Sequence, residues 1–529
     1  MPITPPPTYD LFDEPWIPVR WRTPAAPGEE GRDQHPHEVG LHELLTRAHD
    51  IARITAALPP AVSALHRVLY AITARVTGLD EAGPSDNWAE RRAALARTGR
   101  FDSAAIHAYI REHRGRFNLF DPQRPFLQDP RLARECDTRN TAGVDRLVTT
   151  RPSGNNHAWF QHVDSTSPEP PTPGQATLHL LVWHYYGPSG RCSSRTAGDT
   201  TAANTTAGPL RGSLSYHPEG ISLFETLLAG LPEPDRTVSR STDRCPWEWT
   251  ALPDPVSTPP KPTGPCSRLT ARSQHALLLI PDSDGNQVTD AFITWAWRDK
   301  IPGPDDPYLI WQTSKEGRPY PRPADTHRGL WRDLDALLLK TPGGTAQPRR
   351  PEVFETAPEI SAQLRIRALG FEQDGQARDT QFIDTTTPPV LALAEETDQE
   401  AALAVQRLRE LGERYGQRLD RAVKKAWAQF TDAPKISDCT WAEEAAARYW
   451  PAAETEFWEH LRDRDFTGAT GLFRAHAEQA YDTVTHRAMG TQRGARACTA
   501  ARIELYGGPV RPTTESTGTT RRATSTDQT

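Results

Sequence analysis

The sequence predicts an α+β protein in which a large mixed α/β domain, residues 1–385, is followed by a C-terminal four-helix bundle, residues 386–508, and a disordered tail, residues 509–529. Three observations predict this fold class. The chain has 529 residues, which exceeds the size at which one hydrophobic core usually stops growing. Helical and hairpin-like segments alternate with proline-rich connectors up to about residue 390. From Glu395 onward proline nearly vanishes, and apolar residues recur at spacings of three and four, which is typical of amphipathic helices.

The first domain is predicted to contain both strands and helices. Residues 9–21 indicate an extended strand, and residues 178–183 indicate another. Apolar periodicity predicts three helices, over about 62–78, 88–96 and 106–110. The expected hairpins are formed by 276–280 with 288–295 around the turn 282–286, and by 370–378, where Asp374-Gly375 is a favoured turn pair.

The second domain is predicted to begin with one long helix. The apolar residues that share its face are Ala404, Leu408, Leu411, Tyr415, Leu419, Val423, Trp427 and Phe430. That face needs partners, and further amphipathic stretches occur at 441–449, 454–462, 472–488 and 497–506. A four-helix bundle is the simplest arrangement that covers it. Beyond Gly508 the chain is too polar to pack and is expected to be disordered.

The segment Thr196–His217 is expected to form a long irregular loop, because small side chains make up most of it. Its glycines permit backbone conformations that other residues avoid. Thr205, Thr206 and Ser213 supply short hydrogen-bonding side chains beside one cation, Arg211. Two interpretations stay open. The loop lies against a nucleic-acid groove or phosphate strand, where Arg211 binds an anion, or it is a surface loop without a ligand.

Residues 207–218, followed by 223–230, resemble the CasA family, the large subunits of type I-E Cascade complexes, which are RNA-guided CRISPR assemblies. Four other segments resemble the same family in the same order: Tyr9–Val19, Arg124–Gln128, Ser153–Phe160 and Leu369–Ala377. Together they cover residues 9 to about 505. The resemblance implies a C-terminal bundle. It also implies a non-catalytic subunit that recognises the protospacer-adjacent motif in double-stranded DNA, helps open the duplex for guide-RNA pairing (R-loop formation) and recruits a helicase-nuclease in antiviral defence.

The resemblance assigns a wedge to the 370–378 hairpin. In the family a hairpin here inserts a glutamine into the target DNA next to the motif. Gln376 matches this residue, but the loop is one residue longer than in a relative, so Gln373 is a second candidate. Wedging a side chain between base steps costs a few kcal/mol of stacking, which duplex contacts must offset. The alternative is a solvated turn glutamine.

The resemblance also assigns minor-groove reading to a glycine-rich loop and a lysine. Here Ala202, Ala203, Asn204 and Thr205 replace the consecutive glycines of relatives, and the lysine matches Lys300. Small side chains still permit close approach, whereas Asn204 adds a donor and an acceptor, so motif preference is expected to differ. The predicted DNA-contacting residues of this region are Ala203, Asn204, Thr205, Thr206, Arg211 and Lys300. An ordinary exposed lysine is the alternative for Lys300.

Two further segments are candidates for contact with nucleic acid. In relatives a loop matching 155–160 contacts the guide-RNA 5′ handle and the neighbouring backbone subunit, and the matching residues here are Asn156, His157, Trp159 and Phe160. Aromatic rings stack on unpaired bases, although a core tryptophan is the alternative. On the bundle Arg418, Arg421, Lys424 and Lys425 crowd about two turns of helix. They suit phosphate contact or are a solvated face.

Composition limits the remaining functions. A formal net charge of −7 and a pI of about 6.2 argue against one large basic face, but they permit a local basic channel. The six cysteines contain no C-x-x-C pair and are expected to be buried thiols. Some relatives carry central cysteine pairs, whereas this region holds only Cys245 and Cys266, so no structural zinc and no cofactor is predicted.

An enzymatic function is the less favoured alternative, in the form of a metal-dependent nuclease or hydrolase. His35 and His37 lie in a Pro/Gly-rich loop without a third ligand, and Asp299, Asp305 and Asp306 lack the spacing of a metal cluster. The chain contains no Walker, H-E-x-x-H or G-x-S-x-G motif.

No membrane span or targeting segment is predicted, so cytoplasmic residence is expected. The partners implied by the resemblance are target DNA, the guide RNA, the backbone, small and handle-binding Cascade subunits, and the helicase-nuclease.

Overall fold

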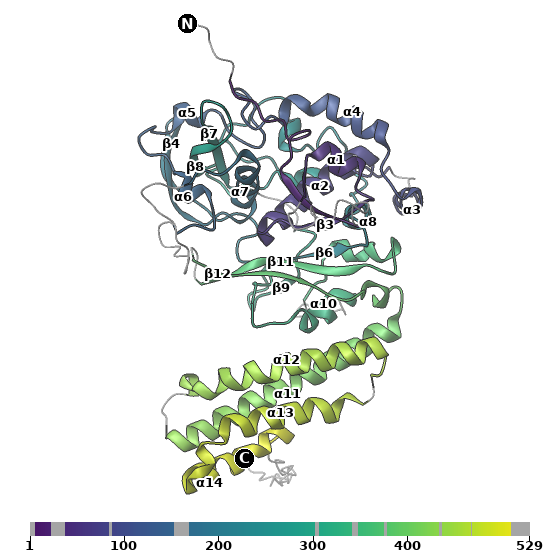
Figure 1. Ribbon diagram of the computed structural model, residues 1–529, viewed down its shortest axis with the longest axis vertical. Coiled ribbons are helices and arrows are strands. Elements are labelled where there is room, and N and C mark those ends of the chain that lie inside the picture. Colours follow the sequence, from purple (N-terminus) through teal and green to yellow (C-terminus); the bar gives the residue numbers. More distant parts are fainter. Residues whose placement is uncertain are drawn as a thin grey trace, which may run out of the picture. The chain divides into compact units, whose positions relative to one another are not determined.

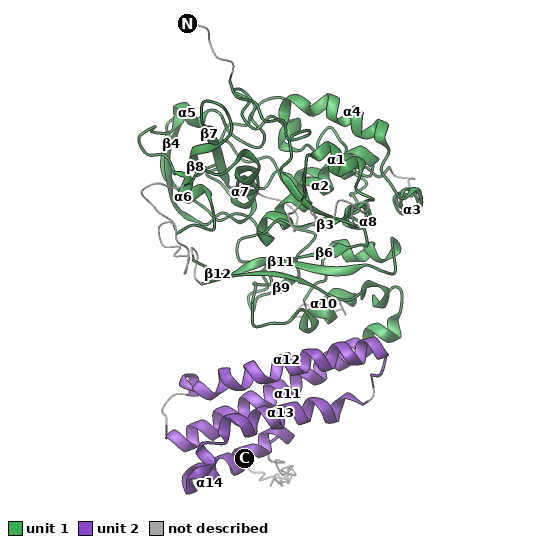
Figure 2. Ribbon diagram, viewed as in Figure 1, with its two compact units in different colours: residues 1–403 green, residues 404–529 purple. Residues whose placement is uncertain are grey.

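The computed structural model describes residues 6–22, 37–83, 87–152, 169–301, 306–340, 348–374, 378–432, 436–466 and 468–508. The chain divides into two compact units, residues 1–403 and 404–529 (Figure 2). Unit 1 mixes helices and sheets and unit 2 is helical (Figure 1), which confirms the predicted α+β class. The domain boundary expected after residue 385 stays a prediction.

Helix α2, Pro59–Thr77, is the central helix of unit 1. It begins with two prolines and ends at Gly78, whose φ of 69° is left-handed. Nearly all of its residues are buried, as expected of a helix that is surrounded by other elements. It contacts α7, Pro173–Tyr186, α8, Leu223–Ala229, and α9, Pro265–Thr270. The three predicted helices are confirmed as α2, α3, Trp88–Thr98, and α4, Ser103–His113.

The strand predicted at 178–183 is wrong, because these residues belong to α7. Thr172 and Gln175 form a reciprocal capping box, and Pro173 occupies the first helical turn. Both favour a helix. The error arose because α7 is buried on almost every side, so its apolar run carries no helical period.

The sheets of unit 1 are small. Strands β1, Ile17–Trp21, β2, His37–Val39, and β3, Ile51–Ile54, form one sheet in the order β2-β1-β3. Only the end of the strand predicted at 9–21 is therefore extended, and residues 11–13 form a turn. The predicted 276–295 hairpin is confirmed as β7, His275–Pro281, with β8, Val288–Trp295.

The irregular loop expected at 196–217 is also wrong. Strands β4, Gly190–Ala197, and β5, Thr200–Thr205, form a hairpin around Gly198-Asp199. The φ of Gly198 is 55°, which suits a two-residue hairpin turn, and the flanking threonines favour strands. A short connector, residues 206–213, then leads to β6, Leu214–Glu219.

The longest strands of unit 1 are β11, Arg365–Asp374, and β12, Arg378–Thr386 (Figure 1). They form an antiparallel sheet in the order β12-β11-β6, and α2 contacts both long strands. The remaining α-helices and strands described in unit 1 are α1, Leu41–Thr46, α5, Leu132–Glu135, α6, Val144–Leu147, α10, Leu334–Leu338, β9, Trp311–Thr313, and β10, Pro319–Pro321.

Unit 2 is the predicted bundle, formed by α11, Gln399–Thr431, α12, Thr440–Asp463, α13, Ala469–Thr485, and α14, Gln492–Ala501. The stretches 441–449 and 454–462 form one helix, because α12 continues through Pro451. Helices α11 and α12 pack closely: a Cβ at Gly416 would lie 2.3 Å from the Trp450 ring, and the Tyr449 hydroxyl donates to Gly412 O at 2.6 Å. The tail expected after Gly508 lies outside the described residues.

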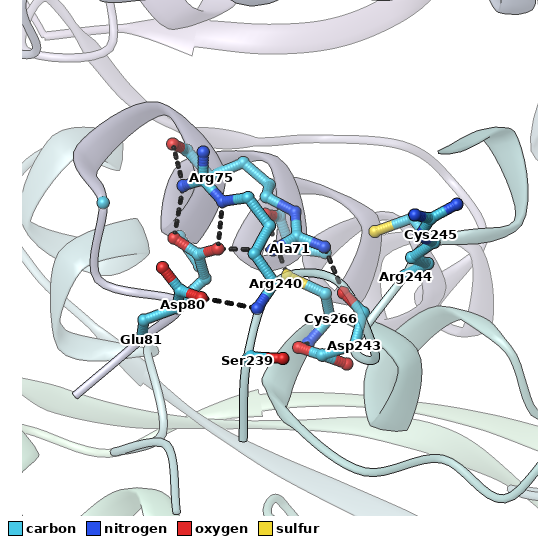
Figure 3. Close-up of polar contacts among 12 residues, drawn as sticks. Ala71, Arg75, Asp80, Glu81, Ser239, Arg240, Asp243, Arg244, Cys245 and Cys266 are labelled. Atoms are coloured by element: carbon cyan, nitrogen blue, oxygen red, sulfur yellow. Dashed lines mark hydrogen bonds and ion pairs between the residues drawn. The ribbon is translucent and has the colours of Figure 1, made fainter. Parts of the chain in front are cut away.

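An ion-pair network around Arg75 cross-links the centre of unit 1 (Figure 3). Arg75 pairs with Asp80, pairs with Glu248 at 2.8 Å and donates to Asp243 O. Arg240 pairs with the same Asp80 at 2.8 Å. The Asp243 carboxylate accepts from the amides of Cys266 and Ser267, 2.9 and 2.7 Å away, at the start of α9. Charged side chains thus connect α2, α9 and the segment 240–248.

All six cysteines are buried as free thiols. Burial raises the pKa of the Cys245 thiol, which keeps it protonated near neutral pH. In the part of the chain that the structure describes, no three His, Cys, Asp or Glu side chains gather as metal ligands would. None of the helices described there has the length and apolar character that a membrane span requires.

Candidate nucleic-acid interface

The β11–β12 hairpin carries the two wedge candidates. Strand β6 pairs with β11 only between Arg365 and Gly370, whereas β12 pairs with β11 as far as Asp374. Beyond Gly370 the hairpin is therefore a two-stranded ribbon, with a bulge between Glu372 and Gln373. The turn 375–377, which includes Gln376, lies outside the described residues.

Gln373 lies at the end of this ribbon, half-buried. With its amide oriented to satisfy its neighbours, its oxygen accepts from the Arg211 guanidinium. The cross-strand partner of Gln373 is Asp379. Gln373 is thus engaged within unit 1, and a role as the wedge requires it to leave Arg211.

Arg211 is held by several groups at once. Its guanidinium pairs with Asp379 Oδ1 at 2.6 Å, donates to Tyr186 O at 3.0 Å and lies 4.8 Å from the Phe371 ring centre. Only 7% of its side chain is exposed. Burial lowers the pKa of Arg211 and raises that of Asp379, so neither charge is well hydrated. Phosphate contact by Arg211, predicted from the sequence, requires this pair to open.

The small residues predicted to read the groove lie on β5. Ala203 is half-buried and Asn204 is exposed. The Thr205 hydroxyl is buried and donates to Gln274 O at 3.3 Å, and the Thr206 hydroxyl donates to Gln274 Oε1 at 3.1 Å. Among the residues of β5 that the sequence predicted to read the groove, Asn204 is therefore the exposed polar side chain that can meet a ligand.

The segment that contains Lys300 is connected to β5 through Arg298. Arg298 donates to Asn204 O at 3.0 Å and lies 5.1 Å from the Trp295 ring centre. Lys300 follows two residues later and is exposed. No carboxylate within the described ranges pairs with it; its neighbours 302–305 lie outside them. The structure therefore brings Asn204 and the segment containing Lys300 to one edge of unit 1, which we call the β5 edge.

The predicted guide-RNA residues Asn156, His157, Trp159 and Phe160 lie outside the described residues. The chain on both sides of them is well anchored. Arg151 donates to Glu169 O at 2.6 Å, which joins the two ends of the segment 153–168. Nearby, burial lowers the pKa of His179 to about 4, so this histidine is neutral at physiological pH.

A cavity of about 360 Å³ lies beside the hairpin, and sequence reasoning missed it. Three arginines contribute to its lining: Arg146, Arg191 and Arg211. Burial lowers the pKa of Arg146, whose guanidinium lies 5.9 Å from the Trp183 ring centre. Phe382, also in the lining, is 42% exposed. Asp379 also lines the cavity and already pairs with Arg211, so Arg146 and Arg191 supply the cations that an anion attached to a planar group could meet beside the ring. No sequence motif connects these residues.

The four cations predicted on the bundle lie on α11 and differ in their partners. Lys424 pairs with Asp420 at 2.9 Å, and Lys425 with Glu504 at 2.7 Å. Arg418 lies 5.3 Å from the Tyr415 ring centre, and Arg421 is exposed. The carboxylates reduce the positive potential that a phosphate would meet at the two lysines.

Of the residues weighed for metal chemistry, only His37, Asp299 and Asp306 belong to the described part of the chain, and they do not gather as metal ligands there. His35 and Asp305 lie outside the described residues, His37 lies in β2, and Asp299 is exposed. Asp306 is buried and pairs with Arg67 at 2.9 Å. Although burial opposes ionisation, the Arg67 guanidinium holds the pKa of Asp306 below its ordinary value. This carboxylate is therefore committed to a structural ion pair.

Comparisons with known proteins agree on one family. The family described as CRISPR-associated protein Cse1 matches residues 10–489. A CasA/Cse1 protein of Thermus thermophilus is 33% identical over 240 residues, which are 44% of this chain and 41% of that relative. A chain of a solved CRISPR RNA-guided surveillance complex is 39% identical, with 95% of this chain and 100% of that chain covered and a TM-score of 0.84. A crystal structure of CasA from Thermus thermophilus, 21% identical with 94% and 98% covered, shares the fold with a TM-score of 0.74.

Proposed function

This chain belongs to the CRISPR-associated Cse1 (CasA) family, and we propose that it is the motif-recognising subunit of an RNA-guided Cascade surveillance complex. The observation that carries the proposal is the match to a chain of such a complex, which covers 95% of this chain with a TM-score of 0.84. The proposed task is to recognise the protospacer-adjacent motif in double-stranded DNA, to start strand separation for guide-RNA pairing and to recruit a helicase-nuclease. The proposed role is non-catalytic.

The β5 edge is the proposed motif reader. A minor groove shows acceptors at A·T pairs and adds the guanine amino donor at G·C pairs. The exposed Asn204 can donate and accept, and Lys300 can donate to the acceptors or to a phosphate. Arg298 holds the two segments together through Asn204 O. This arrangement supports contact with both base edges and backbone.

The β11–β12 turn is the proposed wedge. Gln376 is the preferred residue, because the side chain of Gln373 is already engaged by Arg211. Insertion of a side chain costs a few kcal/mol of unstacking. Contacts made at the β5 edge and by cations elsewhere on the complex would offset that cost. Reading of the motif would therefore precede opening.

The test is reconstitution with a guide-RNA-loaded assembly that lacks this subunit. We expect the chain to co-purify with the assembly and to confer binding on a subset of duplexes with randomised flanking motifs. Gln376→Ala should leave this capture intact and reduce permanganate reactivity of the displaced strand. Gln381→Ala, at an exposed glutamine of β12, is the matched control. Binding that ignores the motif, or divalent-metal-dependent cleavage by the isolated chain, would contradict the proposal.

A further inference from the structure

The end of the β11–β12 hairpin needs support from outside its own strands. Beyond Gly370 no third strand pairs with it in the described part of the chain, because β6 begins opposite that residue. Isolated two-stranded ribbons are marginally stable in water. An opening device at the end of such a ribbon would bend away from the DNA rather than enter it. The contacts that fix the ribbon therefore decide whether the turn can enter the duplex and separate its strands.

Arg211 contacts both strands of the ribbon at one cross-strand pair. Its guanidinium binds Asp379 of β12 at 2.6 Å and the amide oxygen of Gln373 of β11. Gln373 and Asp379 face each other in the register, one pair before Asp374 and Arg378. The Phe371 ring lies against the same guanidinium, 4.8 Å away. Arg211 thus holds the ribbon next to its turn.

The backbone that carries Arg211 is itself fixed to the body of unit 1. In the connector 206–213, Gly208 donates to Gly187 O at 2.9 Å and Leu210 donates to Tyr185 O at 2.9 Å, both at the end of α7. Alanine would not fit at 208, because a Cβ there would lie 2.6 Å from Tyr185 O. Arg211 therefore connects the ribbon to α7, because the connector that carries it is hydrogen-bonded to the end of that helix.

A second contact holds β11 at the neighbouring residue. The Glu372 carboxylate accepts from the amide and the hydroxyl of Thr326, at 2.7 and 2.6 Å. These hydrogen bonds lower the pKa of Glu372 and keep it ionised. Thr326 therefore binds Glu372 and Arg211 binds Gln373, the two residues of β11 on either side of the bulge.

We propose that Arg211 is a positioning residue: it holds the end of the β11–β12 ribbon at the angle that duplex opening requires, and it does not bind phosphate. This inference rests on the proposed function. The ion pair with Asp379 fixes β12. This pair is already formed in the chain without DNA.

Three variants test the proposal in the full chain. Arg211→Gln and Asp379→Asn each break the pair, and the double variant shows whether the two residues act as a unit. Arg97→Gln is the matched control, because this arginine is exposed near the end of α3 and is part of neither the ribbon nor the candidate nucleic-acid interface. Asp379→Asn also covers the case in which Arg211→Gln does not fold.

The first measurement is amide hydrogen exchange in the free chain. We expect Arg211→Gln and Asp379→Asn to speed exchange on the order of tenfold at residues 371–373 and 379–381, which is within the range of couplings between contacting residues. Exchange in β7 and β8 should not change, and the double variant should add little to Arg211→Gln. Unchanged exchange at the ribbon would overturn the proposal.

The second measurement separates capture from opening in the assembled complex. We expect equilibrium capture of motif duplexes and its salt dependence to stay at the wild-type level, while permanganate-detected opening slows on the order of tenfold. Weaker capture with a salt slope reduced by about 0.9 would mean that Arg211 binds a phosphate. That result, or normal opening with a loosened ribbon, overturns the proposal. If the wild-type complex ignores the motif, the proposed function fails, and exchange alone decides whether Arg211 holds the ribbon.

Discussion

Arg75 and Arg298 both belong to unit 1, but their surroundings differ. The Arg75 side chain is 4% exposed and is bound by Asp80, Glu248 and Asp243 O. Arg298 is exposed, and it donates to Asn204 O beside Lys300. Interior charges are matched by partners that the fold supplies. At the β5 edge polar side chains face solvent, where a ligand can supply the partner. Loss of an interior charge should therefore weaken folding, and loss of an edge group should alter recognition.

The largest effect is expected in the Arg75 network. Arg75→Met leaves Asp80 and Glu248 without this partner, and breaking a buried pair by removing one side costs about 3–5 kcal/mol. The free energy of unfolding, obtained from urea titrations monitored by hydrogen exchange of the α2 amides, measures this loss. Arg421→Met, at an exposed position, is the control and should change stability by no more than about 0.5 kcal/mol. A similar loss in both variants would remove the distinction between interior and surface cations.

At the β5 edge the expected effect is on recognition. Asn204→Gly should leave folding intact and change the ranking of motifs by about 1–3 kcal/mol per discriminated base pair. The cause is loss of a group that both donates and accepts. Selection from a randomised duplex library measures the ranking. Identical rankings and affinities would show that this edge touches only the DNA backbone and that another segment reads the groove.

Acid should weaken unit 1 through its buried histidines. Burial lowers the pKa of His179 and of His184 to about 4, from an ordinary value near 6.5. The unfolded chain then binds more protons than the folded chain between these values, so stability is full above about pH 6.5 and falls as pH drops toward 4. Each histidine contributes up to about 1.4 kcal/mol per pH unit. His179→Gln should flatten the slope measured by pH-dependent unfolding, and an unchanged slope would contradict neutral burial.

The smallest effect is expected on α11. Lys424→Gln with Lys425→Gln should weaken duplex binding slightly and equally for all motifs, because both lysines already pair with carboxylates. The salt slope should fall by less than about 1.8, the value for two complete phosphate contacts. Titrations at several salt concentrations measure it, with Arg421→Gln for comparison. Loss confined to some motifs would place base reading on the bundle.

Periodic patterns predicted much of the fold. The spacing of apolar residues predicted α2 and α11, and two apolar runs separated by a turn predicted β7 and β8. In each case the buried residues form a pattern that is visible in the local sequence. Helix α7 was predicted as a strand because a helix buried on nearly all sides carries no period. The β4–β5 hairpin was missed although Gly198-Asp199 between threonines is a local turn signal.

The candidate site was harder to predict, since its contacts join residues far apart in the chain. Arg211 reads as a free cation in a small-residue segment, but its partner Asp379 lies 168 residues away. Likewise Asn204 and Arg298 are 94 residues apart. Local sequence indicates which side chains can bind an anion. Only the fold determines whether a carboxylate of the same chain already occupies them.

The hydrogen bond from Arg151 to Glu169 O closes the chain at the base of the segment 153–168. A segment whose ends are joined can change in length without moving the elements on either side, since doubling such a loop costs only about 0.6 kcal/mol of closure entropy. Insertions and deletions should therefore accumulate between Arg151 and Glu169 more readily than in the connector 206–213, where backbone hydrogen bonds to the end of α7 fix the chain. Changes in the length of this segment should therefore leave α7 in place.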